Sequence, residues 1–163
     1  MSEGTGSLKY EIQQTKPFHS LRHEAVLGLL KTSDLVRRVI SSVVEPAGIT
    51  MQQYNVLRIL RGAGDRALPT LEIRDRMIEQ TPGITRLLDK LEGRGWVTRN
   101  RHGGDRRQVL CLITPQGKAL VDGLDDAVDA IYDRLLGTVS DPDVESLVRA
   151  MDQLRASQSA KSD

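Results

Sequence analysis

The sequence gathers many of its basic residues in one segment, where they could bind a polyanion. From Arg86 to Arg107, seven residues are basic and three are acidic, which gives this segment a net charge of +4. The whole chain carries a formal charge of +1, so the rest of it sums to −3. Guanidinium and ammonium groups that share one surface bind phosphates, whereas a charge run is often only a solvated face. The elements that carry these charges decide between the two interpretations.

The first of these charges belong to a helix that the sequence predicts from Thr81 onward. Thr81 is a suitable N-cap, and Pro82 suits the first helical position because no N–H is needed there. The i, i+3, i+4, i+7 spacing defines a buried face that consists of Ile84, Leu87, Leu88 and Leu91. The outer face consists of Pro82, Gly83, Thr85, Arg86, Asp89 and Lys90. Asp89 repels phosphate, so we expect it to pair with Arg86 or Lys90, or to discriminate against wrong bases.

The remaining charges belong to a predicted β-hairpin. Residues 96–101 and 107–113 are rich in β-forming types, and the sequence HGGD between them supplies the glycines of a hairpin tip. Trp96 opens the first strand and is expected in the core. Cys111 has apolar neighbours, which favours a buried and unreactive thiol, with redox sensing as the open alternative.

Helical periodicity accounts for most of the other segments. Helices are predicted at 20–44, 50–61, 70–80, 115–137 and from 140 to about 155. Thr50 with Gln53 forms a capping box at the second of these helices. The buried face of the third is expected to consist of Leu71, Ile73, Met77 and Ile78.

Two helices joined by a short turn and followed by a hairpin form a winged helix-turn-helix. The expected fold is mainly α with a small β-hairpin wing, and its long N- and C-terminal helices dimerise because one small core cannot cover their apolar faces. The helix from Thr81 then enters a DNA major groove, about 12 Å wide, while the wing reaches phosphates or the minor groove. The predicted parts are a flexible or docking arm (1–18), a dimerisation helix (19–48), the winged helix-turn-helix DNA-binding region (49–114), dimerisation helices (115–157) and a disordered tail (158–163).

Three stretches of the sequence resemble the MarR family of bacterial transcription regulators. They are GITMQQYNVLRILRGAG from Gly48, GITRLLDKLEGRGWVTR from Gly83 and GGDRRQVLCLITPQGKAL from Gly103. The resemblance implies an obligate dimer with interlocked first and last helices, a recognition helix, a wing and often a small-molecule pocket between the two regions.

The resemblance also implies which residues bind DNA. It assigns the recognition helix contacts to Thr81, Pro82, Gly83, Thr85, Arg86 and Lys90. In the wing, Asp105 matches the aspartate that shapes the hairpin tip, and Arg107 matches the arginine that reaches the minor groove. Arg106 is the neighbouring candidate, because a shift of one residue swaps the faces of a strand. The turn from Met77 to Gly83 departs from the family pattern because it lacks a central glycine.

The function that follows is sequence-specific regulation of transcription. A homodimer is expected to bind a pseudo-palindromic operator, with half-sites about one helical turn apart, and the resemblance favours a repressor that a small aromatic or phenolic effector releases. The effector-binding residues and the sign of regulation stay open. The alternatives are a winged helix that docks an acidic protein and a redox-sensing regulator that uses Cys111.

Other classes of function find little support. The sequence has no G-x-S-x-G, H-E-x-x-H or phosphate-loop motif and no paired carboxylates, so no enzyme activity, catalytic residue or cofactor is predicted. His19 and His23 have the i, i+4 spacing of metal ligands, but no third ligand is evident and no metal is expected. There is no apolar run of about 18 residues and no signal peptide, so a cytoplasmic protein without membrane contact is expected.

Overall fold

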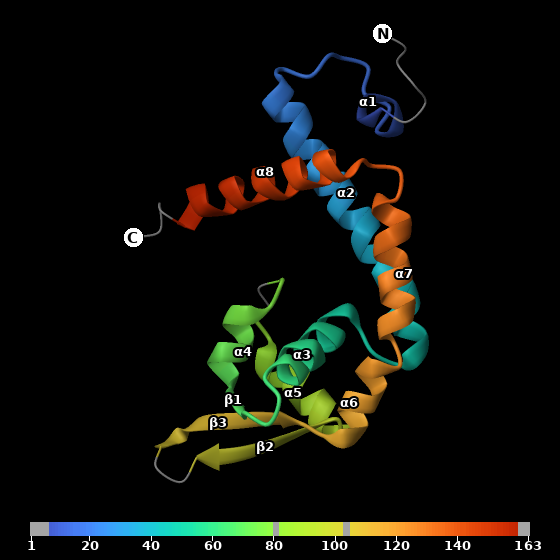
Figure 1. Cartoon of the computed structure of the whole chain (residues 1–163). Coiled ribbons are helices and arrows are strands. Elements are labelled where there is room, and N and C mark those ends of the chain that lie inside the picture. The colour runs from blue at the N-terminus through green and yellow to red at the C-terminus, as the bar shows by residue number, and fades with distance from the viewer. Residues whose placement is uncertain (1–6, 80–81, 103–104, 160–163) are drawn as a thin grey trace.

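The computed structural model describes residues 7–79, 82–102 and 105–159, and for residues 101–102, 105–108 and 159 it describes the backbone only (Figure 1). Most of the described chain is helical, and a small antiparallel sheet lies at one end of the molecule. The elements in chain order are α1 (Leu8–Glu11), α2 (Leu21–Val44), the 3₁₀-helix η1 (Glu45–Ala47), α3 (Met51–Gly62), β1 (Leu68–Pro69), α4 (Thr70–Arg76), α5 (Ile84–Gly93), β2 (Val97–His102), β3 (Asp105–Ile113), α6 (Pro115–Asp122), α7 (Asp125–Leu136) and α8 (Asp141–Ser159).

A body of helices and strands forms one end of the molecule, and long helices extend from it (Figure 1). The body contains α3, α4, α5, α6 and a sheet with the strand order β1-β3-β2. Its core is aliphatic, as the composition predicts, and its fully buried large side chains include Leu57, Leu60, Ile73, Leu88 and Leu91. Helices α4 and α5, followed by the hairpin of β2 and β3, confirm the predicted winged helix-turn-helix fold.

Local chemistry sets several element ends as the sequence predicts. Thr50 and Gln53 form the capping box of α3, with hydrogen bonds of 3.2 and 2.9 Å between each side chain and the other residue's backbone N–H. At the end of α5, Gly95 adopts φ +74° and the Trp96 N–H donates to the carbonyl of Leu91 at 3.0 Å. This glycine-dependent C-cap turns the chain directly into β2.

The start of α6 packs closely on the start of the wing. Thr114 caps α6 by accepting from the Gly117 N–H at 3.1 Å, and its hydroxyl donates to the carbonyl of Gly95 at 2.7 Å. A Cβ at Gly117 would lie 2.2 Å from the carbonyl oxygen of Trp96, so only glycine fits there. The sheet also has a third strand that the sequence did not predict, β1, in which Leu68 pairs with Cys111.

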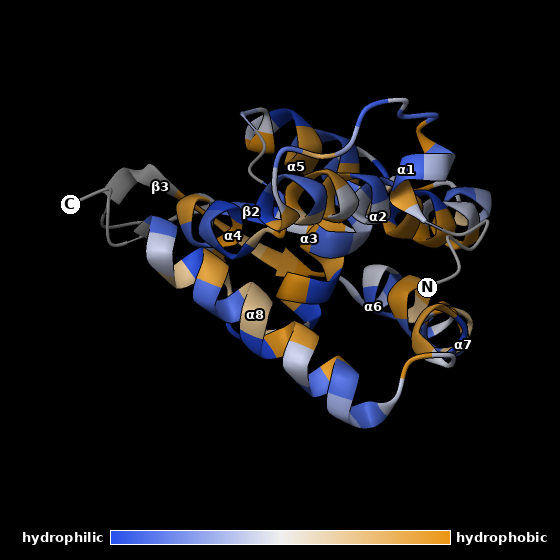
Figure 2. Cartoon of the chain, turned by 90° about the horizontal axis from the view of Figure 1, so that it is seen from above, coloured by the Kyte–Doolittle hydropathy of each residue, from blue (hydrophilic) through white to orange (hydrophobic). Residues whose placement is uncertain are grey.

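The long helices form a separate layer. The helices α2 and α7 lie side by side, and α8 leads away from the end of α7 with no buried side chain among residues 141–158 (Figures 1 and 2). Figure 2 shows apolar residues along α8, and Leu147, Val148 and Leu154 are exposed on it. Leu29 and Leu30 are likewise exposed on α2. The described part of the chain therefore leaves apolar helix faces uncovered.

Several predicted helix bounds are wrong. The helix expected over 115–137 is two helices, because the chain leaves the helical path around Gly123 and Leu124. Helix α8 continues to Ser159, so the first residues of the predicted tail (158–163) are helical. A short helix, α1, forms within the predicted arm (1–18).

The third and fourth helices also differ from their predicted bounds. Helix α4 ends at Arg76, and Leu71 and Ile78 are 61% and 79% exposed, so only Ile73 and Met77 of its predicted buried face are buried. Helix α5 begins at Ile84 with Gly83 as N-cap and no side-chain cap. The predicted cap, Thr81, lies outside the described residues.

Candidate nucleic-acid interface

Helix α5 presents one polar face to solvent and buries the other. Ile84, Leu87, Leu88 and Leu91 are all buried against the body, as their spacing predicts. Thr85, Arg86, Asp89 and Lys90 are exposed on the opposite face. At the helix start, Pro82 is exposed and Gly83 is half-buried. The predicted orientation of α5 is therefore correct, although the helix starts later than predicted.

The exposed cations of α5 have no ion-pair partner among the described residues. Arg86 and Lys90 form no ion pair or hydrogen bond with another side chain in the described part of the chain. Both side chains extend into water from a rigid, packed helix. They can therefore accept an anionic partner without breaking an existing contact.

Arg99, by contrast, is neutralised within the body. Its guanidinium lies 2.6 Å from a carboxylate oxygen of Asp89 and 2.5 Å from one of Glu92, and the side chain is only 20% exposed. The hydrogen bond to Glu92 in particular holds the pKa of Arg99 above its ordinary value. Asp89 was expected to pair with Arg86 or Lys90, and this expectation is wrong because β2 brings Arg99 to it.

The arginines of α4, and Arg66 just before it, also form ion pairs with carboxylates. Arg76 lies 2.5 Å from Glu72, Arg66 binds the same carboxylate at 2.9 Å, and Arg74 pairs with Asp75 at 2.9 Å. The hydrogen bond from Arg66 lowers the pKa of Glu72. Of the two helices of the motif, α5 rather than α4 therefore carries the cations that have no carboxylate partner among the described residues.

The wing extends from the body beside α5 (Figure 1). Strands β2 and β3 pair antiparallel from Val97 opposite Ile113, and the register shifts between Arg101 and His102. Asp105, Arg106 and Arg107 lie on the backbone of β3 next to the tip, while their side chains fall outside the described part of the structure. Their predicted roles therefore stay predictions.

Polar side chains from outside the motif hold the turn between α4 and α5. Asn55 on α3 accepts a hydrogen bond from the Ile78 N–H at 2.9 Å, which satisfies a backbone donor where α4 has ended. Glu79 forms an ion pair with Arg37 of α2 and accepts from Gln52 of α3 at 3.5 Å. Sequence reasoning missed these residues. The only local signal was a run of polar residues, Gln52 and Asn55 among them, on a helix that is otherwise mostly buried.

Two histidines, a cysteine and a tryptophan also stand out in the sequence, and their contacts in the structure are those of packed side chains. His19 and His23 stack at 5.4 Å between ring centroids, and no group of three potential ligand side chains that could hold a metal occurs among the described residues. Cys111 is fully buried, and burial raises the pKa of its thiol. Trp96 is only half-buried, with the Arg94 guanidinium 5.4 Å from its ring centroid. None of the described helices is long and apolar enough to cross a membrane.

Known transcription regulators share this sequence pattern and this fold. Residues 49–109 match the model of the MarR family. The crystal structure of a MarR transcription factor from Planctomyces limnophilus is 35% identical, with a TM-score of 0.65 over 84% of this chain and 99% of that chain. The regulator FarR of Neisseria gonorrhoeae is 26% identical over 70% of this chain and 77% of its own length. The fold also matches S. aureus MepR, solved as a DNA complex, at 20% identity and a TM-score of 0.73 over 79% of this chain and 94% of that chain.

Proposed function

The chain belongs to the MarR family of transcription regulators, which are not enzymes, and we propose that it binds a pseudo-palindromic DNA operator as a homodimer. We further propose that it represses transcription until a small aromatic or phenolic effector releases it. The predicted parts remain part of this proposal, with DNA binding by 49–114 and dimerisation by 19–48 and 115–157.

The exposed face of α5 is the observation that carries the proposal. Arg86 and Lys90 extend from it without partners among the described residues, while the nearby Arg99, Arg76 and Arg74 are neutralised. A helix held by four buried aliphatic residues can enter a major groove as a rigid body. The side chains proposed to contact DNA are Thr81, Pro82, Gly83, Thr85, Arg86 and Lys90 on the helix, and Asp105, Arg106 and Arg107 on the wing.

Uncovered apolar faces support the homodimer. Exposed leucines and valines on α2 and α8 lie outside the body, on helices that are separated from its sheet (Figure 1). A second copy of the chain offers the same faces, so a two-fold arrangement buries both sets at once. Two recognition helices related by this symmetry then read two half-sites.

A buried hydroxyl on α3 supports a site for the proposed effector. Tyr54 of α3 is 3% exposed, and its hydroxyl has no hydrogen-bond partner among the described residues. Burying a hydroxyl without a partner is unfavourable, so a ligand that supplies one there gains affinity. A screen of phenolic and aromatic compounds that leaves DNA affinity unchanged contradicts this part of the proposal.

Titration with salt tests DNA binding directly. A population of duplexes selected from random sequence by the protein gives the probe, and its affinity is measured between 50 and 200 mM salt. With about six phosphate contacts, the affinity falls roughly 1,000-fold over this range. If the basic face instead docks an acidic protein, no duplex is selected and no such slope is seen.

A further inference from the structure

The break between α6 and α7 joins two parts of the molecule. Helix α6 packs on α3 and so belongs to the DNA-binding body, whereas α7 packs on α2 in the layer of long helices. Only Gly123 and Leu124 separate α6 from α7. We call these two residues the joint. The angle between α6 and α7 at the joint sets the orientation of the body relative to the proposed dimerisation helices.

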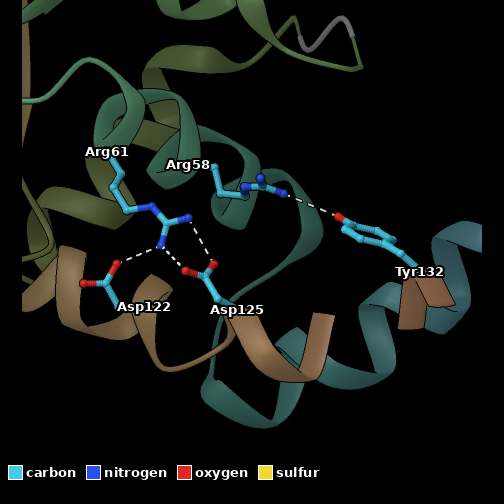
Figure 3. Close-up of polar contacts among 5 residues, drawn as sticks. All are labelled: Arg58, Arg61, Asp122, Asp125 and Tyr132. Atoms are coloured by element: carbon cyan, nitrogen blue, oxygen red, sulfur yellow. Dashed lines mark hydrogen bonds and ion pairs between the residues drawn. The ribbon is translucent and has the colours of Figure 1, made fainter. Parts of the chain in front are cut away.

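One arginine binds a carboxylate on each side of the joint (Figure 3). Arg61, in the last turn of α3, lies 2.7 Å from Asp122, the last residue of α6. It also makes a two-pronged contact with Asp125, the first residue of α7, at 2.7 and 3.0 Å. The Arg61 side chain is 21% exposed, so solvent screens this cluster less than an ion pair on an open surface.

The geometry of the Arg61–Asp125 contact restricts the angle between α6 and α7. A guanidinium is planar, and its two-pronged hydrogen bonds to a carboxylate fix both distance and orientation, which a lysine ammonium does not. One turn earlier on α3, Arg58 reaches the Tyr132 hydroxyl on α7 at 3.4 Å, which makes a second and weaker link (Figure 3). Neither aspartate was singled out by its sequence context.

We propose that Arg61 is a positioning residue, which fixes the angle between the DNA-binding body and α7 by binding Asp122 and Asp125 together. In a dimer this angle sets the distance between the two recognition helices, and so the half-site spacing that the protein accepts. The part that concerns spacing rests on the function proposed above. The part that concerns the angle does not depend on DNA.

Distance measurements by electron spin resonance test the angle without DNA. Spin labels are placed on the full chain at two exposed positions, Asn100→Cys on β2 and Asp129→Cys on α7, and the labelled protein is diluted with unlabelled protein. Arg61→Met is expected to broaden or shift the distance distribution, and Asp125→Asn to do so less. Arg61→Lys is expected to restore it only in part. A distribution identical to that of the wild type in all three variants overturns the proposal.

A matched control is available within the body. Arg66 also makes a two-pronged contact with one carboxylate, Glu72, at 3.2 and 2.9 Å, but this contact lies within the body and does not involve α6 or α7. Arg66→Met is therefore expected to leave the distance distribution unchanged. Thermal unfolding of every variant identifies any that fails to fold, and in that case Asp122→Asn and Asp125→Asn decide the outcome. Equal broadening in Arg66→Met and Arg61→Met contradicts the assignment to the joint.

Operators of different spacing test the functional consequence. The selected half-site is placed in duplexes with the preferred spacer and with one or two base pairs more or fewer. Arg61→Met is expected to reduce the preference for the best spacer by roughly 5- to 10-fold, while Arg66→Met retains it. An unchanged spacing preference in Arg61→Met overturns the inference about spacing. If the wild type binds no duplex, the proposed function fails, and the distance measurement still decides the role of Arg61.

Discussion

At the scale of single residues, the meaning of a basic side chain depends on its partners. Arg86 and Arg99 both belong to the positive segment of the sequence, but Arg99 is bound by Asp89 and Glu92 while Arg86 faces water. Only the uncommitted cation gains from meeting a phosphate or a guanine edge. The net charge of the segment therefore overstates the charge that is available for binding.

Substitutions of three arginines test the proposed interface. Arg86→Ala is expected to weaken binding of the selected operator by about 1–3 kcal/mol and to relax its sequence preference, because a base contact is lost. Arg107→Ala is expected to lower affinity more evenly across sequences, as loss of a backbone or minor-groove contact does. Arg134→Ala, an exposed residue of α7, removes the same charge away from α5 and serves as the control. Equal, negligible losses for Arg86 and Arg107 mean that the interface is misplaced.

The ion pairs of Arg61 give a second prediction at this scale. Its hydrogen bonds hold the pKa of Asp125 below the ordinary value of 3.8. A depressed carboxyl pKa stabilises the folded state above the unfolded-state value, and this contribution disappears as the pH falls through the folded-state value. Asp125→Asn is expected to cost about 1 kcal/mol or less at pH 7, because Asp125 is 40% exposed.

Urea unfolding of wild type and Asp125→Asn from pH 7 to pH 3 checks this prediction. The difference in the free energy of unfolding is expected to be constant down to about pH 5 and to shrink below about pH 4. A difference that grows on acidification contradicts the assigned direction of the pKa shift.

At the scale of elements, side chains from other helices hold the turn between α4 and α5. The turn lacks a central glycine, and side chains from two other helices contact it: Asn55 and Gln52 from α3, and Arg37 from α2. The entry of α5 is thus tied to a helix that we propose takes part in dimerisation. Long-range contacts therefore hold the start of a turn that lacks the central glycine of the family pattern.

The Arg37–Glu79 pair can be tested by exchanging its charges. Arg37→Glu is expected to weaken operator binding by a few-fold, since it places two carboxylates together beside the turn. The double variant Arg37→Glu with Glu79→Arg restores opposite charges and is expected to recover most of the affinity.

The neighbouring Arg38 provides the control. It pairs with Asp34 on its own helix at 2.8 Å, so Arg38→Glu makes the same charge change without touching the turn. A loss in Arg38→Glu equal to that in Arg37→Glu, or no recovery in the double variant, attributes the effect to charge on α2 in general.

At the scale of the whole molecule, α8 gains little from the rest of its own chain. Leu147, Val148 and Leu154 remain exposed on it, and most of the stability of a helix in a protein comes from packing of its apolar face. Leu147→Glu with Leu154→Glu is expected to convert the dimer to monomers and to weaken operator binding strongly, because two half-sites are no longer bound together.

Sedimentation at micromolar concentration measures this effect. Leu71→Glu makes the same change at an exposed leucine of α4, in the body, and is expected to leave the mass unchanged. A wild-type protein that sediments as a monomer at every concentration contradicts the dimer proposal.

The sequence by itself determined the features that depend on neighbours within a few residues. Apolar spacing fixed the buried and exposed faces of α5, and Thr50, Thr114 and the glycines after α5 fixed element ends, because caps and periodicity act within one or two turns. The candidate interface on α5 could be predicted for the same reason. Its face is the complement of a buried stripe that four aliphatic residues define.

Only the tertiary structure decided which charges cancel and where the body meets the long helices. Arg99 meets Asp89 because β2 returns beside α5, and Arg61 meets Asp122 and Asp125 because α6 packs on α3. Ile78 is exposed beyond the end of α4, and Asn55 satisfies its backbone N–H from 23 residues away. These contacts join residues that are distant in sequence, so no local pattern encodes them.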